Sequence, residues 1–353
     1  MKKYFKNKKV LITGNTGFKG SWLSLWMYHY GANVMGIANS IPSKPSNFKV
    51  LNLNKKIKCK KIDIRDSKKL LKVIKTFKPD YIFHLAAEAI VKRAYENPKR
   101  TWEINTIGTI NILESLKQLK NNVASVIITS DKVYKNFELN RGYKENDILG
   151  GLDPYSASKA AADYAVQSYI NNGLSSKKNL KIAIARAGNV IGGGDWSFSR
   201  IIPDCVRSWS KNKPVKIRNP NSTRPWQHVL DVLYGYIILA VILKKNKKVN
   251  GEAFNFGPKI EKKREVINVV KAMQKYWPRS KIIVKKEKIF KESKLLQLNS
   301  AKAKKILKWN CNMNLKQTIN LTINWYKKYY FSPQNLFSYS MEQIKNYENS
   351  VKK

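Results

Sequence analysis

The chain has 353 residues, enough to bury a large core and to form about two domains, or one large α/β unit with an appendage. Lysine and arginine number 68 against 23 acidic residues, which gives a formal net charge of +45. This charge would suit a nucleic-acid partner, but the lysines are spread along the whole chain and form only short clusters. The distribution therefore indicates a solvated basic surface and does not favour a nucleic-acid-binding protein.

The cysteines and the apolar stretches further limit the class of protein to which this sequence can belong. Cys59, Cys205 and Cys311 lie far apart and form no Cys-x-x-Cys pair, so we expect reduced thiols in a cytoplasmic protein and no metal site. No secretory signal is visible, and the longest apolar stretch, residues 232–243, is too short to span a bilayer. We expect this stretch to form a buried helix, and we expect no association with membranes.

The N-terminal segment predicts a βαβ unit that binds a dinucleotide. Residues 10–13 form a short apolar strand, a glycine-rich turn follows, and an apolar helix begins near Ser21. Gly31 ends this helix, and residues 33–38 supply a second strand. Three glycines spaced Gly-x-x-Gly-x-x-Gly would let a pyrophosphate approach the amides at the helix N-terminus, and they are Gly14, Gly17 and Gly20.

The end of the second strand leaves the choice of cofactor open. Dinucleotide folds of this kind have an acidic residue there, which holds the ribose 2′-hydroxyl of NAD. This chain has Asn39 and Ser40 instead, and no arginine that would hold the 2′-phosphate of NADP. The position therefore does not separate NAD from NADP.

The rest of the chain continues the alternation of strands and helices. Further strands are predicted over residues 58–62, 79–87, 123–129 and 181–187, and the pattern becomes less regular after about residue 190. We expect an α/β protein with a Rossmann doubly wound parallel sheet and a smaller C-terminal α/β substrate-binding domain.

The domain boundary is expected to be discontinuous. An apolar helix from Val229 and a strand at residues 253–256 are expected to return to the main sheet. The Rossmann domain would then comprise residues 1–190 completed by 229–257, and the smaller domain residues 191–228 and 258–353. The polar tail from about Phe331 is expected to be peripheral.

Tyr155 and Lys159 are the first catalytic candidates. Four residues apart at the start of a predicted helix, they share one face, where the ammonium would favour the phenolate and make it a base near neutral pH. The spacing alone is weak evidence, because an ordinary exposed helix face often carries such a pair. Ser130 follows the fifth predicted strand, and sites in such sheets form at the carboxyl ends of strands, so it completes a triad of hydroxyl, phenol and ammonium.

Five segments in order resemble the extended short-chain dehydrogenase/reductase family, and within it the nucleotide-sugar 4,6-dehydratases. They lie at residues 16–23, 129–132, 153–162, 186–196 and 223–229, and the resemblance extends from Val10 to about Trp309. It implies a catalytic set comprising Ser130, Asp131, Lys132, Tyr155 and Lys159. It implies cofactor binding by Gly14, Thr16, Gly17, Phe18, Gly20, Asp63, Ile64, Leu85, Ala86, Ala87, Tyr155 and Lys159. For the substrate diphosphate it implies Asn189, Arg200 and Arg224.

The reaction that the resemblance implies converts CDP-glucose to CDP-4-keto-6-deoxyglucose and water. Tyr155 would remove the C4 hydroxyl proton as hydride passes to NAD, with Ser130 hydrogen-bonded to the same oxygen, and the hydride would return to C6 after water is lost. NAD would therefore be tightly retained and regenerated in each turnover. Water loss needs a further acid and base, for which Asp131 and Lys132 are the candidates. Lysine is a base only when neutral, so Lys132 could instead be a fixed cation that stabilises an enolate.

Alternatives to this reaction stay open. The nearest is another enzyme of the same family, a C4 epimerase or a dehydratase of a different nucleotide sugar, and the pair Asp131 and Lys132 argues against the epimerase. Glu88 and Ala89 depart from the Gln-Pro pair that is more usual beside the sugar pocket, so the hexose is less certain than the reaction. A catalytically silent Rossmann-like protein that binds nucleic acid is a distant alternative. By analogy we expect a homodimer or higher homo-oligomer, serving deoxysugar synthesis for a surface polysaccharide.

Some polar and aromatic residues receive structural interpretations. His84, at the end of an apolar strand, is expected to be a packed histidine, and Asp66 is expected to cap a helix. Asn105 is expected to support the site from a neighbouring helix. Arg200 has a surface ion pair as its alternative to substrate binding, and Trp226 has core packing as its alternative to a contact with the nucleotide.

Overall fold

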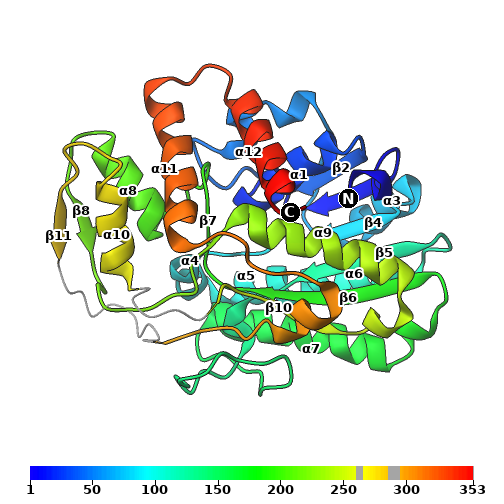
Figure 1. Ribbon diagram of the computed structural model, residues 1–353. Helices are drawn as coiled ribbons and strands as arrows, with labels where there is room; N and C mark the ends of the chain where they lie inside the picture. The colour runs from blue at the N-terminus through cyan, green and yellow to red at the C-terminus, as the bar shows by residue number, and fades with distance from the viewer. Residues whose placement is uncertain (260–264, 285–294, 353) are drawn as a thin grey trace.

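A computed structural model of the chain describes residues 1–259, 265–284 and 295–352. Its central sheet has seven strands in the order β10-β6-β5-β4-β1-β2-β3 (Figure 1). Every neighbouring pair in this sheet is parallel, so the predicted Rossmann doubly wound fold is confirmed. The strands are β1 (Lys9–Thr13), β2 (Asn33–Ala38), β3 (Lys58–Lys61), β4 (Tyr81–His84), β5 (Val123–Ile128), β6 (Leu180–Ala187) and β10 (Ala253–Phe256).

Helices cover both faces of the sheet (Figure 1). One face carries α1 (Phe18–His29), α9 (Val229–Lys245) and α12 (Leu336–Ser350), and the other carries α3 (Ser67–Phe77), α6 (Gly108–Lys117) and α7 (Pro154–Asn171). Alternate residues of a strand serve the two cores: Val10 and Ile12 pack with α1 and α9, and Leu11 packs with α3 and α6. A parallel sheet buried on both faces needs the near-continuous apolar strands that this sequence has.

The remaining elements form a lobe beside the sheet and its connections. β8 (Val215–Ile217) pairs with β11 (Ile282–Val284), and β7 (Val190–Ile191) pairs with β9 (Gln227–His228). In Figure 1, β8 and β11 lie to one side of the sheet together with α8 (Ile201–Trp209) and α10 (Val266–Gln274). α11 (Leu315–Phe331) lies next to them. Three short helices complete the set, α2 (Asn47–Val50), α4 (Val91–Glu96) and α5 (Pro98–Trp102).

The segment before and including β10 returns to the main sheet, as predicted. α9 packs on β5 and β6, and Ala253 of β10 is in register with Ile184 of β6. β6 and β10 are therefore neighbours in the sheet although they are far apart in sequence. The division into a cofactor domain and a substrate domain at residues 190, 229 and 257 stays a proposal.

The C-terminal tail belongs to the core, and the expectation that it is peripheral is wrong. α12 packs against α1, and its Leu336 and Tyr347 are buried. The Tyr347 hydroxyl donates a hydrogen bond of 2.9 Å to Asp231 of α9, whose carboxylate also accepts from the Asn312 amide at 2.9 Å. The polar composition misled the prediction because the buried residues of α12 recur at helical spacing on one face only.

The hydrophobic helix predicted over residues 232–243 is α9, which is buried along most of its length. Within the three described ranges, no helix is both long and apolar enough to cross a membrane. In the same ranges, no three His, Cys, Asp or Glu side chains come together as metal ligands. Cys59, Cys205 and Cys311 are all free thiols.

Candidate active site

The glycine turn between β1 and α1 forms a cradle that fits a dinucleotide. Gly14 has φ of +71°, and a Cβ there would lie 2.8 Å from the Ala86 amide nitrogen. A Cβ at Gly20 would collide with the Gly14 carbonyl oxygen, so turn and helix can approach this closely only with glycine. At Gly17, the N-cap of α1, a Cβ would meet just that same oxygen, at 3.3 Å, among the described atoms. The open side of Gly17 and the helix amides beside it are suited to a pyrophosphate.

The other predicted cofactor residues of this region lie around the turn. The Thr16 hydroxyl donates a 2.7 Å hydrogen bond to the Ser40 carbonyl and ties the turn to the end of β2. The Ala86 amide donates to the Thr13 hydroxyl at 3.2 Å, which holds the segment after β4 against the turn. The structure therefore gathers predicted cofactor residues of two segments at the carboxyl ends of β1 and β4. They are Thr16 and Phe18 of the first segment and Leu85, Ala86 and Ala87 of the second.

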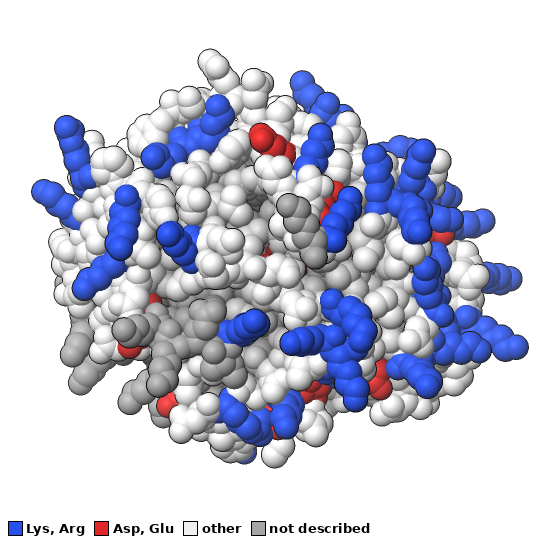
Figure 2. All heavy atoms as spheres, viewed as in Figure 1, with Lys and Arg blue, Asp and Glu red and all other residues white. Residues whose placement is uncertain are grey.

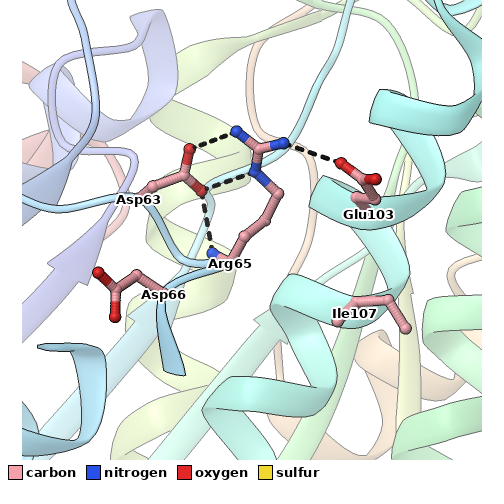
Figure 3. Close-up of a pocket in the computed structure, with 5 residues that line it drawn as sticks. All are labelled: Asp63, Arg65, Asp66, Glu103 and Ile107. Atoms are coloured by element: carbon pink, nitrogen blue, oxygen red, sulfur yellow. Dashed lines mark hydrogen bonds and ion pairs between the residues drawn. The ribbon is translucent and has the colours of Figure 1, made fainter. Parts of the chain in front are cut away.

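A pocket of about 400 Å³ lies beyond the end of β3 (Figure 3). Its lining residues are Asp63, Arg65, Asp66, Glu103 and Ile107. The Arg65 guanidinium crosses the pocket and donates to Asp63 Oδ2 at 2.8 Å and to Glu103 Oε2 at 2.9 Å (Figure 3). Hydrogen bonds from Arg65 hold the pKa of Asp63 at about 2, against the opposing effect of partial burial. Asp63 is therefore an anion in this pocket at neutral pH.

Of the two neighbours of Asp63, Asp66 has its expected role, and the cofactor contact of Ile64 stays a prediction. Asp66 caps α3, since its carboxylate accepts from the Lys69 amide at 3.0 Å. Ile64 is buried against Gly108, where a side chain would collide with it. Asn39, at the end of β2, donates to Asp63 Oδ2 at 3.3 Å. The two strand ends that were considered for cofactor recognition are thus in direct contact.

The structure brings the five predicted catalytic residues together. Ser130 and Asp131 follow β5 and are only 5% and 4% exposed, and the Ser130 hydroxyl donates to Asp131 Oδ1 at 2.9 Å. The Ser130 hydroxyl acts on the Tyr155 phenol so as to lower its pKa, and Lys132 Nζ lies 6.0 Å from the centroid of the Tyr155 ring. Lys159 is one turn further along α7 and is also buried. Their individual roles stay predictions.

Local sequence explains why Tyr155 lies where it does. Asp153 is the N-cap of α7 and accepts from the Ser156 amide at 3.0 Å, and Pro154 occupies the first helical position. This cap begins the helix immediately before Tyr155. Tyr155 therefore occupies the first turn, next to the end of β5.

Burial dominates the electrostatics of the catalytic groups. It raises the pKa of Asp131, against the opposing charge of Lys132, so this carboxyl is suited to carry a proton. It raises the pKa of Tyr155 to about 12, although the hydrogen bond with Ser130 acts in the opposite direction. Burial and, next, the charge of Lys19 lower the pKa of Lys159 to about 7.

The expected effect of Lys159 on Tyr155 is not met in this structure. The Lys159 ammonium donates to the Ile128 carbonyl at 2.8 Å, and the raised pKa of Tyr155 is set first by burial. Sequence spacing places two side chains on one helix face but does not determine how deeply that face is buried. The phenol therefore needs further positive charge in the site before it can act as a base near neutral pH.

Lys19 and Tyr236 lie beside this group and were missed from the sequence. Lys19 Nζ lies 5.8 Å from the centroid of the Tyr236 ring, and burial, with Arg200 next, lowers the pKa of Lys19 to about 8. Tyr236 is fully buried, and its hydroxyl has no hydrogen-bond partner within the described part of the chain. A signal for Lys19 was present, because it is a charge in the first turn of a helix whose residues 20–27 are all buried.

The three predicted substrate residues lie on neighbouring segments. The Asn189 carbonyl accepts from the Gln227 amide at 3.1 Å, which joins the segment after β6 to β9. Arg224 is close enough to Asp131 for its charge to lower the pKa of that carboxyl. Arg200 forms an ion pair of 3.1 Å with Asp195, as its alternative interpretation predicted, and it also acts electrostatically on Tyr155.

His84, Asn105 and Trp226 have the structural roles that were considered for them. His84 is packed between Thr13 Oγ1, at 2.8 Å from Nδ1, and Thr109 Oγ1, at 3.1 Å from Nε2, and burial lowers the pKa of His84 to about 3. Asn105 accepts from the Glu88 amide at 2.8 Å, so it supports the segment that follows β4. Trp226 is buried in the core.

Lys159→Met is expected to stabilise the cofactor-free protein more at pH 6 than at pH 10. The pKa of Lys159 is about 7 in the folded state and would be about 10.4 in the unfolded chain. Between these values the unfolded chain binds more protons, so the stability of the wild type rises with pH and the full penalty of Lys159 applies below pH 7. Removing the amine should raise the free energy of unfolding by about 4 kcal/mol at pH 6, with most of the gain lost by pH 10.

Urea unfolding at the two pH values measures this difference. Lys135→Met is the matched control, because Lys135 is an exposed lysine and its replacement should change the free energy of unfolding little at either pH. Equal gains at pH 6 and pH 10 would show that buried charge is not the cause.

The site combines a dinucleotide cradle, a Ser-Tyr-Lys group at the strand ends and an adjacent Asp and Lys. Fold and site together define a nucleotide-sugar enzyme of the extended short-chain dehydrogenase/reductase class. A family described as GDP-mannose 4,6 dehydratase matches residues 11–322. The chain belongs to this family of nucleotide-sugar dehydratases.

Individual relatives agree with this assignment. The chain is 40% identical to a CDP-glucose 4,6-dehydratase of Salmonella typhimurium, with 99% of each chain covered. It is 25% identical to a UDP-glucose 4-epimerase of Mycoplasma genitalium, with 91% of this chain and 97% of the relative covered. A solved dTDP-glucose 4,6-dehydratase from Bacillus anthracis in complex with NAD has a TM-score of 0.75 at 23% identity, covering 92% of this chain and 99% of that one. At this identity the structural likeness shows the shared fold.

Proposed function

We propose that the protein catalyses the 4,6-dehydration of CDP-glucose, a hydro-lyase reaction that yields CDP-4-keto-6-deoxyglucose and water. The observation that carries the proposal is the buried Asp131 with Lys132 beside it, next to Ser130 and Tyr155. An epimerase needs only the hydroxyl, phenol and ammonium, whereas an elimination needs a further acid and base. The 40% identity to a CDP-glucose 4,6-dehydratase over the whole chain supports the same reaction.

Each side chain has a defined task in this reaction. When bound, NAD supplies the hydride acceptor for C4 and the hydride donor for C6. Tyr155 takes the proton of the C4 hydroxyl, and Ser130 hydrogen-bonds that oxygen. Lys132 removes the proton from C5, which the adjacent ketone has made acidic, and Asp131 protonates the departing C6 hydroxyl. The raised pKa of the buried Asp131 supports its role as the acid.

NAD is the cofactor that the residues favour over NADP. A 2′-phosphate belongs at the end of β2, where Asn39 contacts the anionic Asp63. The charge of Arg65 is already engaged by Asp63 and Glu103. A second anion there would meet the Asp63 carboxylate, whereas a ribose hydroxyl could donate to it.

The diphosphate of the substrate is assigned to Arg224, with Asn189 and Arg200 beside it. Guanidinium groups bind phosphate oxygens bidentately. Both arginines act electrostatically on catalytic groups, Arg224 on Asp131 and Arg200 on Tyr155, so both are close to the reacting sugar.

We also infer a homodimer or higher homo-oligomer. Trp102 of α5, Tyr164 of α7, and Ile107 in the helical turn after α5 are large apolar or aromatic side chains. All three are exposed, on helical segments that pack against one another. Association through these helices would bury them. Sedimentation velocity at two protein concentrations measures the oligomeric state.

The basic surface does not favour the nucleic-acid alternative. Figure 2 shows Lys and Arg side chains at many separate places on the visible face, most densely in its right half, with fewer acidic side chains between them. A nucleic-acid groove would gather them along one path, together with aromatic side chains for stacking. We therefore infer that the basic side chains of this surface are solvated and do not form a nucleic-acid-binding site.

Transfer of a deuterium label tests the proposed reaction. CDP-glucose deuterated at C4 is incubated with the protein and NAD, with no added reductant, and the product is analysed by NMR. We expect deuterium at C6 of a 4-keto-6-deoxy sugar, because the hydride removed from C4 returns to the same substrate. Release of one equivalent of reduced cofactor, or inversion at C4, would contradict the proposal, and Tyr155→Phe serves as the control without a base.

A further inference from the structure

Asp131 and Lys132 lie in a single short helical turn that has little support of its own. The turn comprises Asp131–Val133, with Ser130 before it and Tyr134 after it, and residues 130–133 are called the catalytic turn below. The Ser130 hydroxyl accepts from the Lys132 amide at 3.2 Å and donates to Asp131 Oδ1 at 2.9 Å. So short a turn has few hydrogen bonds of its own, and its position depends on what holds its two ends.

Thr129 is bonded at the first end of the catalytic turn. It follows β5 directly, precedes Ser130 and is 5% exposed. Its hydroxyl donates a 3.0 Å hydrogen bond to Asp163 Oδ2 of α7, one helical turn beyond Lys159. The strand end that carries Ser130 is therefore tied by a side chain to the helix that carries Lys159.

Tyr134 is bonded at the second end. It is 2% exposed, and its hydroxyl accepts from Arg186 Nη1 at 2.9 Å and donates to Asn255 Oδ1 at 2.7 Å. Arg186 belongs to β6 and Asn255 to β10, so both bonds lead from the turn to the central sheet. The main chain beside Tyr134 pairs instead with residues 148–150, which belong to neither strand. The phenol oxygen therefore joins this end of the turn to two strands of the sheet.

One buried ion pair serves both ends. Arg186 donates to Asp163 from Nε at 2.9 Å and from Nη2 at 2.8 Å, and the two side chains are 1% and 0% exposed. Asp163 Oδ2 accepts from both Arg186 Nε and Thr129, and Nη1 of the same guanidinium donates to Tyr134. A buried bidentate pair is a rigid support, because moving either partner would leave a buried charge unpaired. The two ends of the catalytic turn are therefore held by the same fixed group.

We propose that Thr129 and Tyr134 are positioning residues that hold the catalytic turn in its reactive position, each for a different step of the reaction. The inference rests on the proposed function. Thr129 is bonded next to Ser130, which is assigned to the C4 oxygen, so loss of its hydroxyl should slow C4 oxidation. Tyr134 is bonded at the end nearer to Lys132, which is assigned to the C5 proton, so loss of its hydroxyl should slow elimination. Displacement of a reacting group by about 1 Å can lower a rate about 100-fold.

Tyr134→Phe tests the second end. The substitution keeps the ring, which stacks on Tyr143 with 5.2 Å between centroids, and Arg186 keeps the Glu145 carbonyl as an acceptor at 2.9 Å. In a single turnover with enzyme in excess over CDP-glucose, stopped-flow absorbance follows reduced nicotinamide, and rapid quenching with NMR follows water loss. We expect C4 oxidation within about 2-fold of the wild type and elimination slowed about 10- to 100-fold, so that reduced nicotinamide accumulates.

Thr129→Val tests the first end and should have the opposite signature. Asp163 Oδ2 keeps its bond from Arg186 in this variant, so the ion pair stays intact. We expect reduced nicotinamide to appear about 10-fold more slowly and not to accumulate, because oxidation becomes the slower step. Thr129→Ser keeps the hydroxyl and should restore most of the rate. If serine does not restore it, the bond to Asp163 is not the cause and the proposal is wrong for this residue.

Tyr143→Phe is the matched control. Tyr143 is 1% exposed, and its hydroxyl is bonded to Asn136 Oδ1 at 2.9 Å and to the Phe137 amide at 2.6 Å, within its own loop. Its loss should lower stability without slowing one step more than the other. If Tyr143→Phe gives the same accumulation of reduced nicotinamide as Tyr134→Phe, or if Tyr134→Phe slows both steps by one factor, lost stability is the cause and the proposal is overturned.

Hydrogen exchange of the protein without substrate separates the positioning role from the reaction. The Lys132 amide, which is bonded to Ser130 Oγ, should exchange about 10-fold faster in Tyr134→Phe and Thr129→Val, and at the wild-type rate in Tyr143→Phe. Mass spectrometry of the peptide that contains Lys132 measures this rate. Unchanged exchange in both variants would overturn the positioning role whatever the reaction is. If exchange changes as expected but the wild type forms no 4-keto-6-deoxy sugar from CDP-glucose, the proposed function fails while the positioning of the turn stands.

Discussion

Replacing Lys132 with methionine is expected to leave C4 oxidation intact and to lower product formation about 100- to 1,000-fold. Methionine keeps the length of the side chain but removes the nitrogen that would take the C5 proton. Ser130, Tyr155 and Lys159 are unchanged, so the hydride can still leave C4. Stopped-flow absorbance should therefore show reduced nicotinamide that accumulates on the enzyme, while NMR shows a 4-keto sugar that keeps its C6 hydroxyl.

Lys132→Arg separates the two roles considered for this lysine. Arginine keeps the positive charge but stays protonated, so it cannot be a base. A base role predicts that arginine is as inactive as methionine, and a purely electrostatic role predicts that arginine restores much of the elimination. Lys135→Met is the matched control, because Lys135 is exposed and lies 5.3 Å from the Phe137 ring centroid, away from the triad. Near wild-type elimination by Lys132→Met would rule out both roles.

The central sheet could be predicted because its signals are local. Residues 10–13, the glycine turn and residues 33–38 specify strand, turn and strand within one short segment, and the structure has β1, α1 and β2 there. The helix begins at Phe18, three residues before the predicted start, because Gly17 is the N-cap and the turn tightens directly into the helix. The strand at residues 253–256 could also be placed, since an apolar strand that follows a buried helix needs a neighbour in the sheet.

The parts of the site that sequence could not supply depend on contacts between distant segments. Lys19 on α1 and Tyr236 on α9 are 217 positions apart and meet only because both helices pack on the same face of the sheet. The high pKa of Tyr155 and the low pKa of Lys159 come first from burial, and spacing along a helix carries no information on depth. The positions of the predicted strand ends indicated which residues would lie together in the site. They could not indicate the protonation states of those residues.

A buried ion pair joins α7, the helix that carries Tyr155 and Lys159, to strand β6. Arg186 of β6 and Asp163 of α7 are joined at 2.8 Å, and their side chains are 1% and 0% exposed. Asp163 also accepts from the Thr129 hydroxyl at 3.0 Å, next to Ser130, and Arg186 donates to the Tyr134 hydroxyl at 2.9 Å. Asp163 is one helical turn beyond Lys159, so the pair fixes α7 against the strand ends that carry the site.

Arg186→Met is therefore expected to lower the free energy of unfolding by about 3–5 kcal/mol, because it leaves the Asp163 carboxylate buried without a counter-ion. The double variant Arg186→Met with Asp163→Leu removes both charges and should recover most of this loss. Urea unfolding measures both, and Arg141→Met, which breaks an ion pair with Asp147 in which the arginine is half exposed, should cost less than about 1 kcal/mol. If the double variant is as unstable as Arg186→Met, the loss comes from the contacts with Tyr134 and the neighbouring backbone, and the uncompensated charge is not its cause. If stability returns while turnover stays low, the pair acts on catalysis by holding α7, because the double variant would be folded with its catalytic residues displaced.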